Sequence, residues 1–150
     1  MNEFDLVVLG GGSGGYACAL RAAQLGLSVA LIEKDKVGGT CLHRGCIPTK
    51  ALLEHAHALK IAQSAKEWGL TLPPGEVGID MGQVQSRKDR IVNSLSKGVE
   101  FLFKKNKIEW IRGTGRLAGR GVVEVSGDQS TTLQARDIII ATGSAVRGLP

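Results

Sequence analysis

The chain has 150 residues, of which 43% are hydrophobic and 22% are charged, and this size and composition fit one globular domain with its own core. The net charge of +5 is scattered, and its densest group, Lys104, Lys105 and Lys107, fits a solvated helix end, so we expect no nucleic-acid partner. No apolar run has the length of a membrane span or secretory signal, so we expect no membrane partner and a soluble, cytoplasmic protein, or a mature protein whose targeting peptide has been removed.

The first third of the chain predicts a strand–helix–strand unit. Residues 4–9 form a continuous apolar run, which is typical of a parallel strand buried on both faces. Residues 16–25 are rich in alanine and leucine and indicate a helix that Gly26 can end. Residues 27–33 indicate a second strand. Together these segments predict a βαβ unit of about 30 residues.

Two further helices are predicted in the middle of the chain. Residues 51–66 indicate a helix, and residues 69–82 a loop that contains Pro73 and Pro74. Residues 84–105 predict a long amphipathic helix, because apolar side chains recur there at helical spacing.

The last part of the chain predicts strands. Short strands at 108–112, 121–125 and 131–135, with a turn at Gly127-Asp128, suggest a small antiparallel meander. Residues 137–141 form another buried-strand pattern. The predicted fold class is therefore α/β: a Rossmann-like domain with a parallel sheet, helices on both faces, and the meander inserted before the last strand.

Gly10, Gly12 and Gly15 form a G-x-G-x-x-G motif between the first strand and the first helix. In such a motif the first glycine allows a tight turn, the second leaves room for a pyrophosphate, and the third lets the helix approach the strand. Glu33 follows 18 residues after Gly15, where a carboxylate accepts the hydroxyls of a ribose and repels a 2′-phosphate. The motif therefore predicts FAD or NAD rather than NADP, and does not separate the first two.

Cys41 and Cys46 form a C-x4-C pair, and Cys18 is the remaining cysteine. Four intervening residues can bring two Cα atoms within the roughly 4.4–6.8 Å that a disulfide spans. A zinc site needs a second ligand pair, which neither Cys18 nor the three histidines supply convincingly. Pro48 can start a helix after the pair, and a thiol at a helix N-terminus has a lowered pKa. We interpret the pair as a reactive dithiol rather than a metal site or a structural staple.

Two nearby side chains have ordinary interpretations. His43 lies between the two cysteines, but nothing in the sequence places it against a substrate proton, so we expect an exposed side chain. Cys18 falls in the first predicted helix, where we expect a small buried residue.

The stretch GGTCLHRGCIPTK, residues 38–50, resembles the redox-active segment of the pyridine nucleotide–disulfide oxidoreductases. Leu42 and the IPTK sequence are most similar to the branch of the family that oxidises dihydrolipoamide. The resemblance implies that Cys46 faces the flavin as a charge-transfer thiolate and that Cys41 is the thiol that attacks lipoamide. It also implies that Lys50 lies near the flavin ring.

The resemblance covers the whole chain and implies an FAD site made from several segments. Gly113-Thr114-Gly115 falls where the family contacts adenine, and residues 141–144 fall where the chain returns to the middle of FAD. Cys41 and Cys46 are the implied catalytic residues. The implied cofactor-binding residues are Gly10, Gly12, Ser13, Gly14, Gly15, Glu33, Lys34, Gly39, Thr40, Cys41, Cys46, Lys50, Gly115, Ala141, Thr142, Gly143 and Ser144.

For a whole enzyme, the resemblance implies NAD as final acceptor, a homodimer, and the lipoyl domain of 2-oxo-acid dehydrogenase complexes as partner. The sequence holds no second G-x-G-x-x-G motif and no His–Glu base pair of the family. We therefore expect residues 1–150 to be the N-terminal FAD-binding domain of a longer enzyme, and to form no NADH alone. The alternatives are an NADPH-dependent reductase similar to glutathione or mercuric reductase, and a non-catalytic FAD-binding module.

Overall fold

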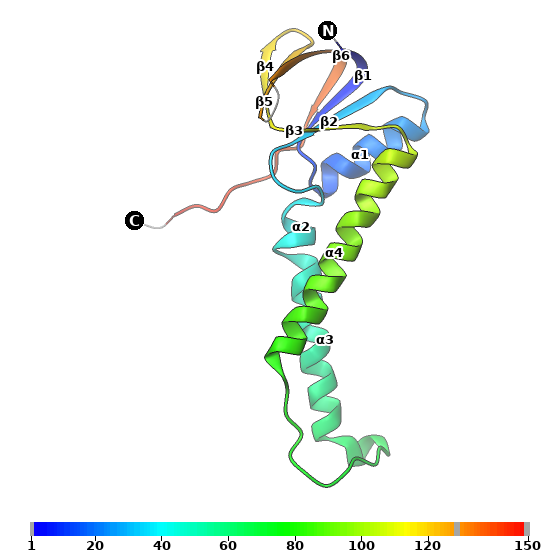
Figure 1. Cartoon of the computed structure of the whole chain (residues 1–150), viewed down its shortest axis with the longest axis vertical. Helices are drawn as coiled ribbons and strands as arrows, with labels where there is room; N and C mark the ends of the chain where they lie inside the picture. Colours follow the sequence, from blue (N-terminus) through cyan, green and yellow to red (C-terminus); the bar gives the residue numbers. More distant parts are fainter. Residues whose placement is uncertain (1, 128–129, 149–150) are drawn as a thin grey trace.

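A computed structural model describes residues 2–127 and 130–148, and it shows one mixed sheet from which a pair of long helices extends (Figure 1). The sheet has six strands in the order β3-β2-β1-β6-β5-β4. In chain order the strands are β1 (Asn2–Leu9), β2 (Val29–Glu33), β3 (Glu109–Arg112), β4 (Thr114–Gly119), β5 (Val122–Ser126) and β6 (Thr131–Ile140). The helices are α1 (Ser13–Gln24), α2 (Gly39–His43), α3 (Cys46–Gln63), the 3-10 helix η1 (Ala65–Trp68) and α4 (Met81–Lys105).

The parallel part of the sheet contains β3, β2, β1 and β6, with β1 paired to both β2 and β6. Leu6, Val7, Val8 and Leu9 of β1 are all buried, as their continuous apolar run predicts for a strand covered on both faces. α1 connects β1 to β2, and Gly26 follows its C-terminus with a φ of 88°. The Rossmann-like α/β class predicted from the sequence is confirmed.

Two apolar cores cover the two faces of the parallel strands. On one face, Val8 and Leu31 pack with Ala19 of α1 and Phe103 of α4. On the other face the partners are the buried residues of β5 and β6, so strands rather than helices fill that side. The prediction of helices on both faces is therefore wrong for the described residues. The cause is the alternation of buried Val123 and Val125 with exposed Glu124, which gives β5 an apolar inner side.

The antiparallel meander consists of β4, β5 and β6. Residues 108–112 were expected to belong to it, but β3 instead pairs in parallel with β2 at the far edge of the sheet. β4 is absent from the prediction because its two glycines and exposed side chains give a weak strand pattern. Of the predicted turn at Gly127-Asp128, Asp128 lies outside the described residues.

β6 is one strand of ten residues where the sequence predicts two short ones. The apolar pattern breaks at Arg136 and Asp137, and both side chains are exposed. Arg136 forms ion pairs with Asp137 of the same strand and with Asp5 of β1. The charges are therefore solvated at the surface while the backbone ladder to β1 resumes at Asp137 and continues to Ile140.

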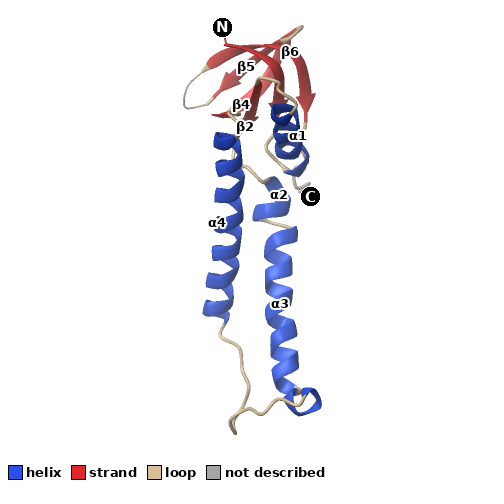
Figure 2. Ribbon diagram, turned by 90° about the vertical axis from the view of Figure 1, so that its right-hand side faces the viewer, coloured by secondary structure: helices blue, strands red, loops and turns tan. Residues whose placement is uncertain are grey.

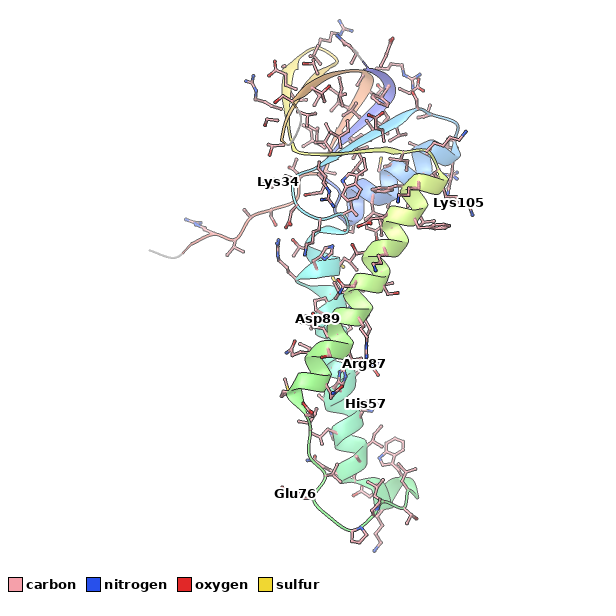
Figure 3. The ribbon with its side chains drawn as sticks, in the orientation of Figure 1. Lys34, His57, Glu76, Arg87, Asp89 and Lys105 are labelled. Atoms are coloured by element: carbon pink, nitrogen blue, oxygen red, sulfur yellow. The ribbon has the colours of Figure 1, made fainter. Side chains whose placement is uncertain are left out.

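α3 and α4 lie side by side and carry η1 and a loop at the end farthest from the sheet (Figure 2). α4 begins at Met81 because Asp80 accepts hydrogen bonds from the backbone N–H groups of Gly82 and Gln83. Figure 3 places His57, Arg87 and Asp89 along this helical pair, far from Lys34 beside the sheet. Among the described residues, no helix is both long and apolar enough to cross a membrane.

Candidate functional site

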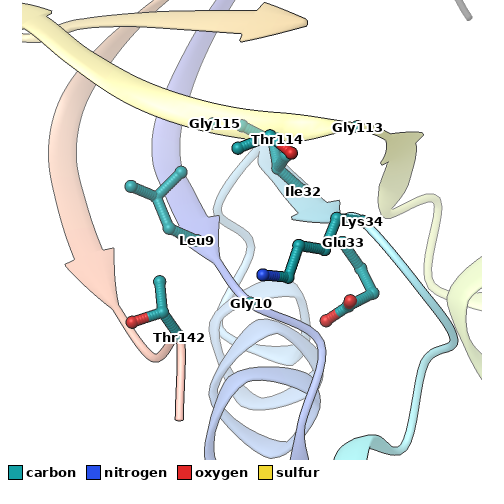
Figure 4. A pocket seen from close by; sticks show the side chains of 9 residues that line it. All are labelled: Leu9, Gly10, Ile32, Glu33, Lys34, Gly113, Thr114, Gly115 and Thr142. Atoms are coloured by element: carbon teal, nitrogen blue, oxygen red, sulfur yellow. The ribbon is translucent and has the colours of Figure 1, made fainter. Parts of the chain in front are cut away.

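Two neighbouring cavities lie at the carboxyl ends of the parallel strands, where open α/β sheets bind their ligands. The first has a volume of about 120 Å³ (Figure 4) and is lined by Leu9, Gly10, Ile32, Glu33, Lys34, Gly113, Thr114, Gly115 and Thr142. The second has a volume of about 150 Å³ and is lined by Gly12, Glu33, Lys34, Asp35, Lys36, Gly39, Thr40, His43, Arg44, Ala141, Thr142, Gly143 and Ser144. Glu33, Lys34 and Thr142 border both cavities, which therefore form one elongated site.

The three motif glycines are constrained by different neighbours. A Cβ atom on Gly10 would lie 2.3 Å from the carbonyl oxygen of Ala141, and one on Gly15 would lie 1.8 Å from that of Gly10. A Cβ atom on Gly12 would meet nothing closer than the Cα atom of Gly39, at 4.0 Å. Protein packing thus excludes a side chain at Gly10 and Gly15. At Gly12 the protein leaves room for a Cβ atom, and glycine there keeps that part of the second cavity open.

Gly12 is also the N-cap of α1, and no side chain caps this end of the helix. The N–H groups of the first turn and the partial positive charge of the helix N-terminus could therefore bind an anionic group without competition from a side chain. Ser13 and Gly14 are exposed in this turn, whereas Gly15 is buried against the end of β1. This end of the cavity is suited to a pyrophosphate.

Glu33 ends β2 and is held by two backbone groups. Its Oε2 accepts a hydrogen bond from the N–H of Gly11 at 2.7 Å, and its Oε1 accepts one from the N–H of Asp35 at 2.8 Å. An ionised carboxylate has about four acceptor positions. Glu33 can therefore fix the glycine-rich loop and still accept the hydroxyls of a ribose.

β4 forms the upper wall of the first cavity, where it crosses above the ends of β1 and β2 (Figure 4). A Cβ atom on Gly115 would lie 2.7 Å from Cδ2 of Leu9 and 3.3 Å from Cδ1 of Ile32. Glycine at this position lets the strand approach the sheet. Gly115, where the family resemblance implies an adenine contact, is therefore packed closely against the side chains of Leu9 and Ile32.

The segment after β6 closes the other side of both cavities. The N–H of Ala141 donates to the carbonyl oxygen of Leu9 at 2.7 Å, which extends the pairing of β6 with β1 by one bond. The next three residues line the second cavity: Thr142, Gly143 and Ser144. The structure thus brings the segment 141–144 beside the glycine-rich loop, more than 120 residues earlier in the chain.

The redox segment packs directly on the glycine-rich loop. A Cβ atom on Gly39 would lie 2.6 Å from Cα of Gly12, and the N–H of Gly38 donates to the carbonyl oxygen of Gly11 at 2.7 Å. α2 is absent from the prediction, because five residues that include a glycine carry no helical period. In this short helix Thr40 lines the second cavity, and Cys41 is the next residue.

Cys41 in α2 and Cys46, the first residue of α3, lie together as free thiols. A side-chain hydrogen bond with Cys46 raises the pKa of the Cys41 thiol from its ordinary value of 9.0, burial adds to this, and the charge of Lys50 opposes it. The raised pKa of Cys41 is the reverse of the lowered thiol pKa that the sequence predicts for a cysteine at a helix N-terminus. Cys18 is half-buried on α1 and packs against the apolar core.

His43 differs from the sequence prediction of an exposed side chain. It is half-buried, and its Nε2 lies 2.8 Å from the carbonyl oxygen of Val37. Arg44, the next residue, forms an ion pair with Asp35 at 2.6 Å. Sequence reasoning missed these residues as part of the site because the loop contacts that hold them have no periodic pattern.

Most of the predicted cofactor-binding residues border the cavities. The predicted residues that line neither cavity are Ser13, Gly14, Gly15, Cys41, Cys46 and Lys50. The cavity residues that the prediction did not include are Leu9, Ile32, Asp35, Lys36, His43 and Arg44. Gly113 and Thr114 also line the first cavity, and they belong to the segment that the resemblance places at adenine, from which only Gly115 was carried over. Leu9 and Ile32 could have been found, since each is the last or next-to-last residue of a predicted parallel strand.

Metal-ligand groups do not gather in the part of the chain that the structure describes. Over residues 2–127 and 130–148, no three His, Cys, Asp or Glu side chains come together in a way that could hold a metal ion. The Cys41 side chain forms a hydrogen bond with that of Cys46.

An α/β sheet with a glycine-rich turn after its first strand and an acid at the end of the second is typical of dinucleotide-binding domains. The chain belongs to the pyridine nucleotide-disulphide oxidoreductase family, whose sequence pattern matches residues 4–150. The chain is 48% identical, over 100% of its length, to dihydrolipoyl dehydrogenase 3 of Pseudomonas putida. It is 45% identical over 99% of its length to dihydrolipoyl dehydrogenase of Bacillus subtilis, and 43% identical over 99% to the mitochondrial dihydrolipoyl dehydrogenase of Schizosaccharomyces pombe. It spans 33%, 33% and 30% of these relatives, about a third of each.

Proposed function

We propose that residues 1–150 are the FAD-binding and redox-disulfide part of an oxidoreductase that converts dihydrolipoamide to lipoamide. The observation that carries this proposal is the open position at Gly12, which borders the second cavity and where a Cβ atom would meet no protein atom closer than the Cα atom of Gly39, at 4.0 Å. Protein packing does not require glycine at this position, which is the uncapped N-terminus of a helix. Both features are expected where a pyrophosphate binds.

The residues around the two cavities fit the parts of FAD in order. Glu33 and Gly115 would hold the adenosine, the first turn of α1 with Gly12 would hold the pyrophosphate, and Thr142 and its neighbours would hold the middle of the cofactor. Lys50 acts electrostatically on Cys41, so a flavin near these residues would lie beside a cation that favours its reduced, anionic form. When bound, FAD supplies a two-electron acceptor next to the dithiol.

Cys41 and Cys46 would carry out thiol–disulfide exchange with the substrate. One thiol of dihydrolipoamide attacks the sulfur of Cys41 in the Cys41–Cys46 disulfide and releases the Cys46 thiolate. The second substrate thiol then attacks the mixed disulfide, which releases lipoamide and leaves both cysteines reduced. Two electrons and two protons pass from the substrate dithiol to the cysteine pair and its surroundings.

The names of the relatives support lipoamide as substrate rather than glutathione or mercuric ion. For the whole enzyme we propose NAD⁺ as final acceptor, a homodimer, a location in the cytoplasm, and the lipoyl domain of 2-oxo-acid dehydrogenase complexes as partner. No observation of the structure favours the NADPH-dependent alternative or a non-catalytic module.

Differential alkylation and anaerobic flavin bleaching test the proposed redox pair. Mass spectrometry of the oxidised chain should find a Cys41–Cys46 disulfide and a free Cys18. Dihydrolipoamide should slowly bleach bound FAD in the wild type and in Cys18→Ser, but not in Cys46→Ser. A disulfide that includes Cys18, or equal bleaching in Cys46→Ser, would show that the assigned pair is wrong.

A further inference from the structure

The joint between α2 and α3 is tied to the loop that follows β2. His43 Nε2 lies 2.8 Å from the carbonyl oxygen of Val37, and Arg44 Nη2 lies 2.6 Å from Oδ2 of Asp35. Because a carbonyl oxygen only accepts hydrogen bonds, the Nε2 atom of His43 carries the hydrogen and donates it. Both contacts end on residues 35–37, the loop that connects Glu33 to the redox segment.

The two contacts differ in strength. The side chains of Arg44 and Asp35 are 70% and 45% exposed. An ion pair with so much exposure to solvent contributes little to the stability of the fold. His43 is half-buried, and its acceptor belongs to Val37, which is 1% exposed within the core. Removal of the imidazole would leave the Val37 carbonyl oxygen without this donor in a partly buried place. The histidine is therefore the firmer of the two anchors.

The position of His43 connects this anchor to the thiols. It is the last residue of α2, two positions after Cys41, and Cys46 begins α3 three positions later. Arg44 and Gly45 have non-helical backbone angles, so residues 44–45 form the break between the two helices, α2 and α3, that carry the sulfurs. Whatever fixes the end of α2 therefore fixes the separation of the two thiols.

We propose that His43 is a positioning residue, whose hydrogen bond to the Val37 carbonyl oxygen holds the Cys41 and Cys46 thiols within bonding range. This inference rests on the proposed function, which assigns the pair as the redox disulfide. Without the hydrogen bond, the reduced pair samples more separations, so closing the disulfide costs more conformational entropy. The equilibrium constant for disulfide formation should then fall.

Equilibration of the 150-residue chain with glutathione redox buffers measures this constant. Cys41 and Cys46 lose two electrons and two protons as their disulfide forms, and one glutathione disulfide becomes two glutathione thiols. After an acid quench and alkylation, mass spectrometry gives the oxidised fraction. We expect His43→Ala to lower the equilibrium constant by about tenfold, which corresponds to about 30 mV for a two-electron couple.

Two conservative variants separate positioning from general support of the fold. The side-chain amide nitrogen of His43→Gln reaches the place of Nε2 and should restore the wild-type constant. In His43→Asn the amide stands where Nδ1 was, too short to reach Val37, so this variant should behave like His43→Ala. His57→Ala, on the exposed side of α3, is the matched control and should leave the constant unchanged.

The comparison of His43→Gln with His43→Asn tests the positioning role of His43 even if His43→Ala does not fold. Equal constants in these two variants, or a wild-type constant in a folded His43→Ala, would overturn the positioning role. A lower thermal midpoint without a change in the constant would also overturn it. A wild-type chain that forms no Cys41–Cys46 disulfide in any buffer would instead contradict the proposed function.

Discussion

Gly15 and Gly12 lie in the same motif, yet different neighbours select glycine at each. A Cβ atom on Gly15 would lie 1.8 Å from a backbone oxygen, which no rearrangement of a side chain can relieve. At Gly12 the nearest protein atom would be 4.0 Å away, an ordinary contact distance. A substitution at Gly15 therefore reports on folding, whereas a substitution at Gly12 reports on whatever fills the cavity.

Cys41 yields a prediction about pH. A hydrogen bond with the Cys46 side chain is the largest cause that raises the pKa of Cys41, so the thiol stays protonated to a higher pH than a free cysteine. Cys46→Ala removes that bond and should lower the pKa of Cys41. At a fixed pH near 8, a larger thiolate fraction should then react faster with iodoacetamide.

The alkylation rate of Cys41 as a function of pH measures this change. The midpoint of the rate profile should move to lower pH in Cys46→Ala, while Cys18→Ser leaves it in place. A midpoint that does not change, or that moves to higher pH, would mean that the Cys46 side chain does not raise the pKa of Cys41.

At the scale of elements, local patterns predicted the strands and helices that have a strong period. The apolar run of β1 and the amphipathic pattern of α4 are examples, and both elements are present. The prediction failed where tertiary contacts overrule local pattern. α2 follows Gly38 and Gly39, which contact the glycine-rich loop at Gly11 and Gly12. β6 continues through Arg136 because its backbone pairs with β1 on both sides of that residue.

The start of α4 at Met81 depends on Asp80, whose Oδ1 accepts from the N–H groups of Gly82 at 2.7 Å and Gln83 at 3.1 Å. Asp80→Ala should destabilise the chain by about 1 kcal/mol, because these two N–H groups lose their acceptor. Urea unfolding of the variant beside Asp80→Ser, which keeps an N-cap oxygen, measures the loss. Equal stabilities of the two variants would show that the cap contributes nothing.

At the scale of the whole molecule, the sheet gathers segments that are distant in sequence into one elongated site. Glu33 ends β2, Gly115 lies in β4, and residues 141–144 follow β6, and each of them borders one or both of the two cavities. The glycine motif and its acid could be predicted because their spacing is local. The contacts of His43 and Arg44 with residues 35–37 could not, because an irregular loop determines them.

Binding of FAD to three forms of the chain tests the central proposal most directly. Titration followed by flavin fluorescence should show binding by the wild type and, equally, by Gly98→Ala, whose added Cβ meets nothing within 4 Å on the exposed side of α4. Gly12→Ala should fold normally but bind at least about tenfold more weakly, because its methyl group would occupy the place that we propose for the pyrophosphate. Gly12→Val should abolish binding. Retention of FAD by Gly12→Val with the affinity of the wild type would show that the glycine-rich turn is not the cofactor site.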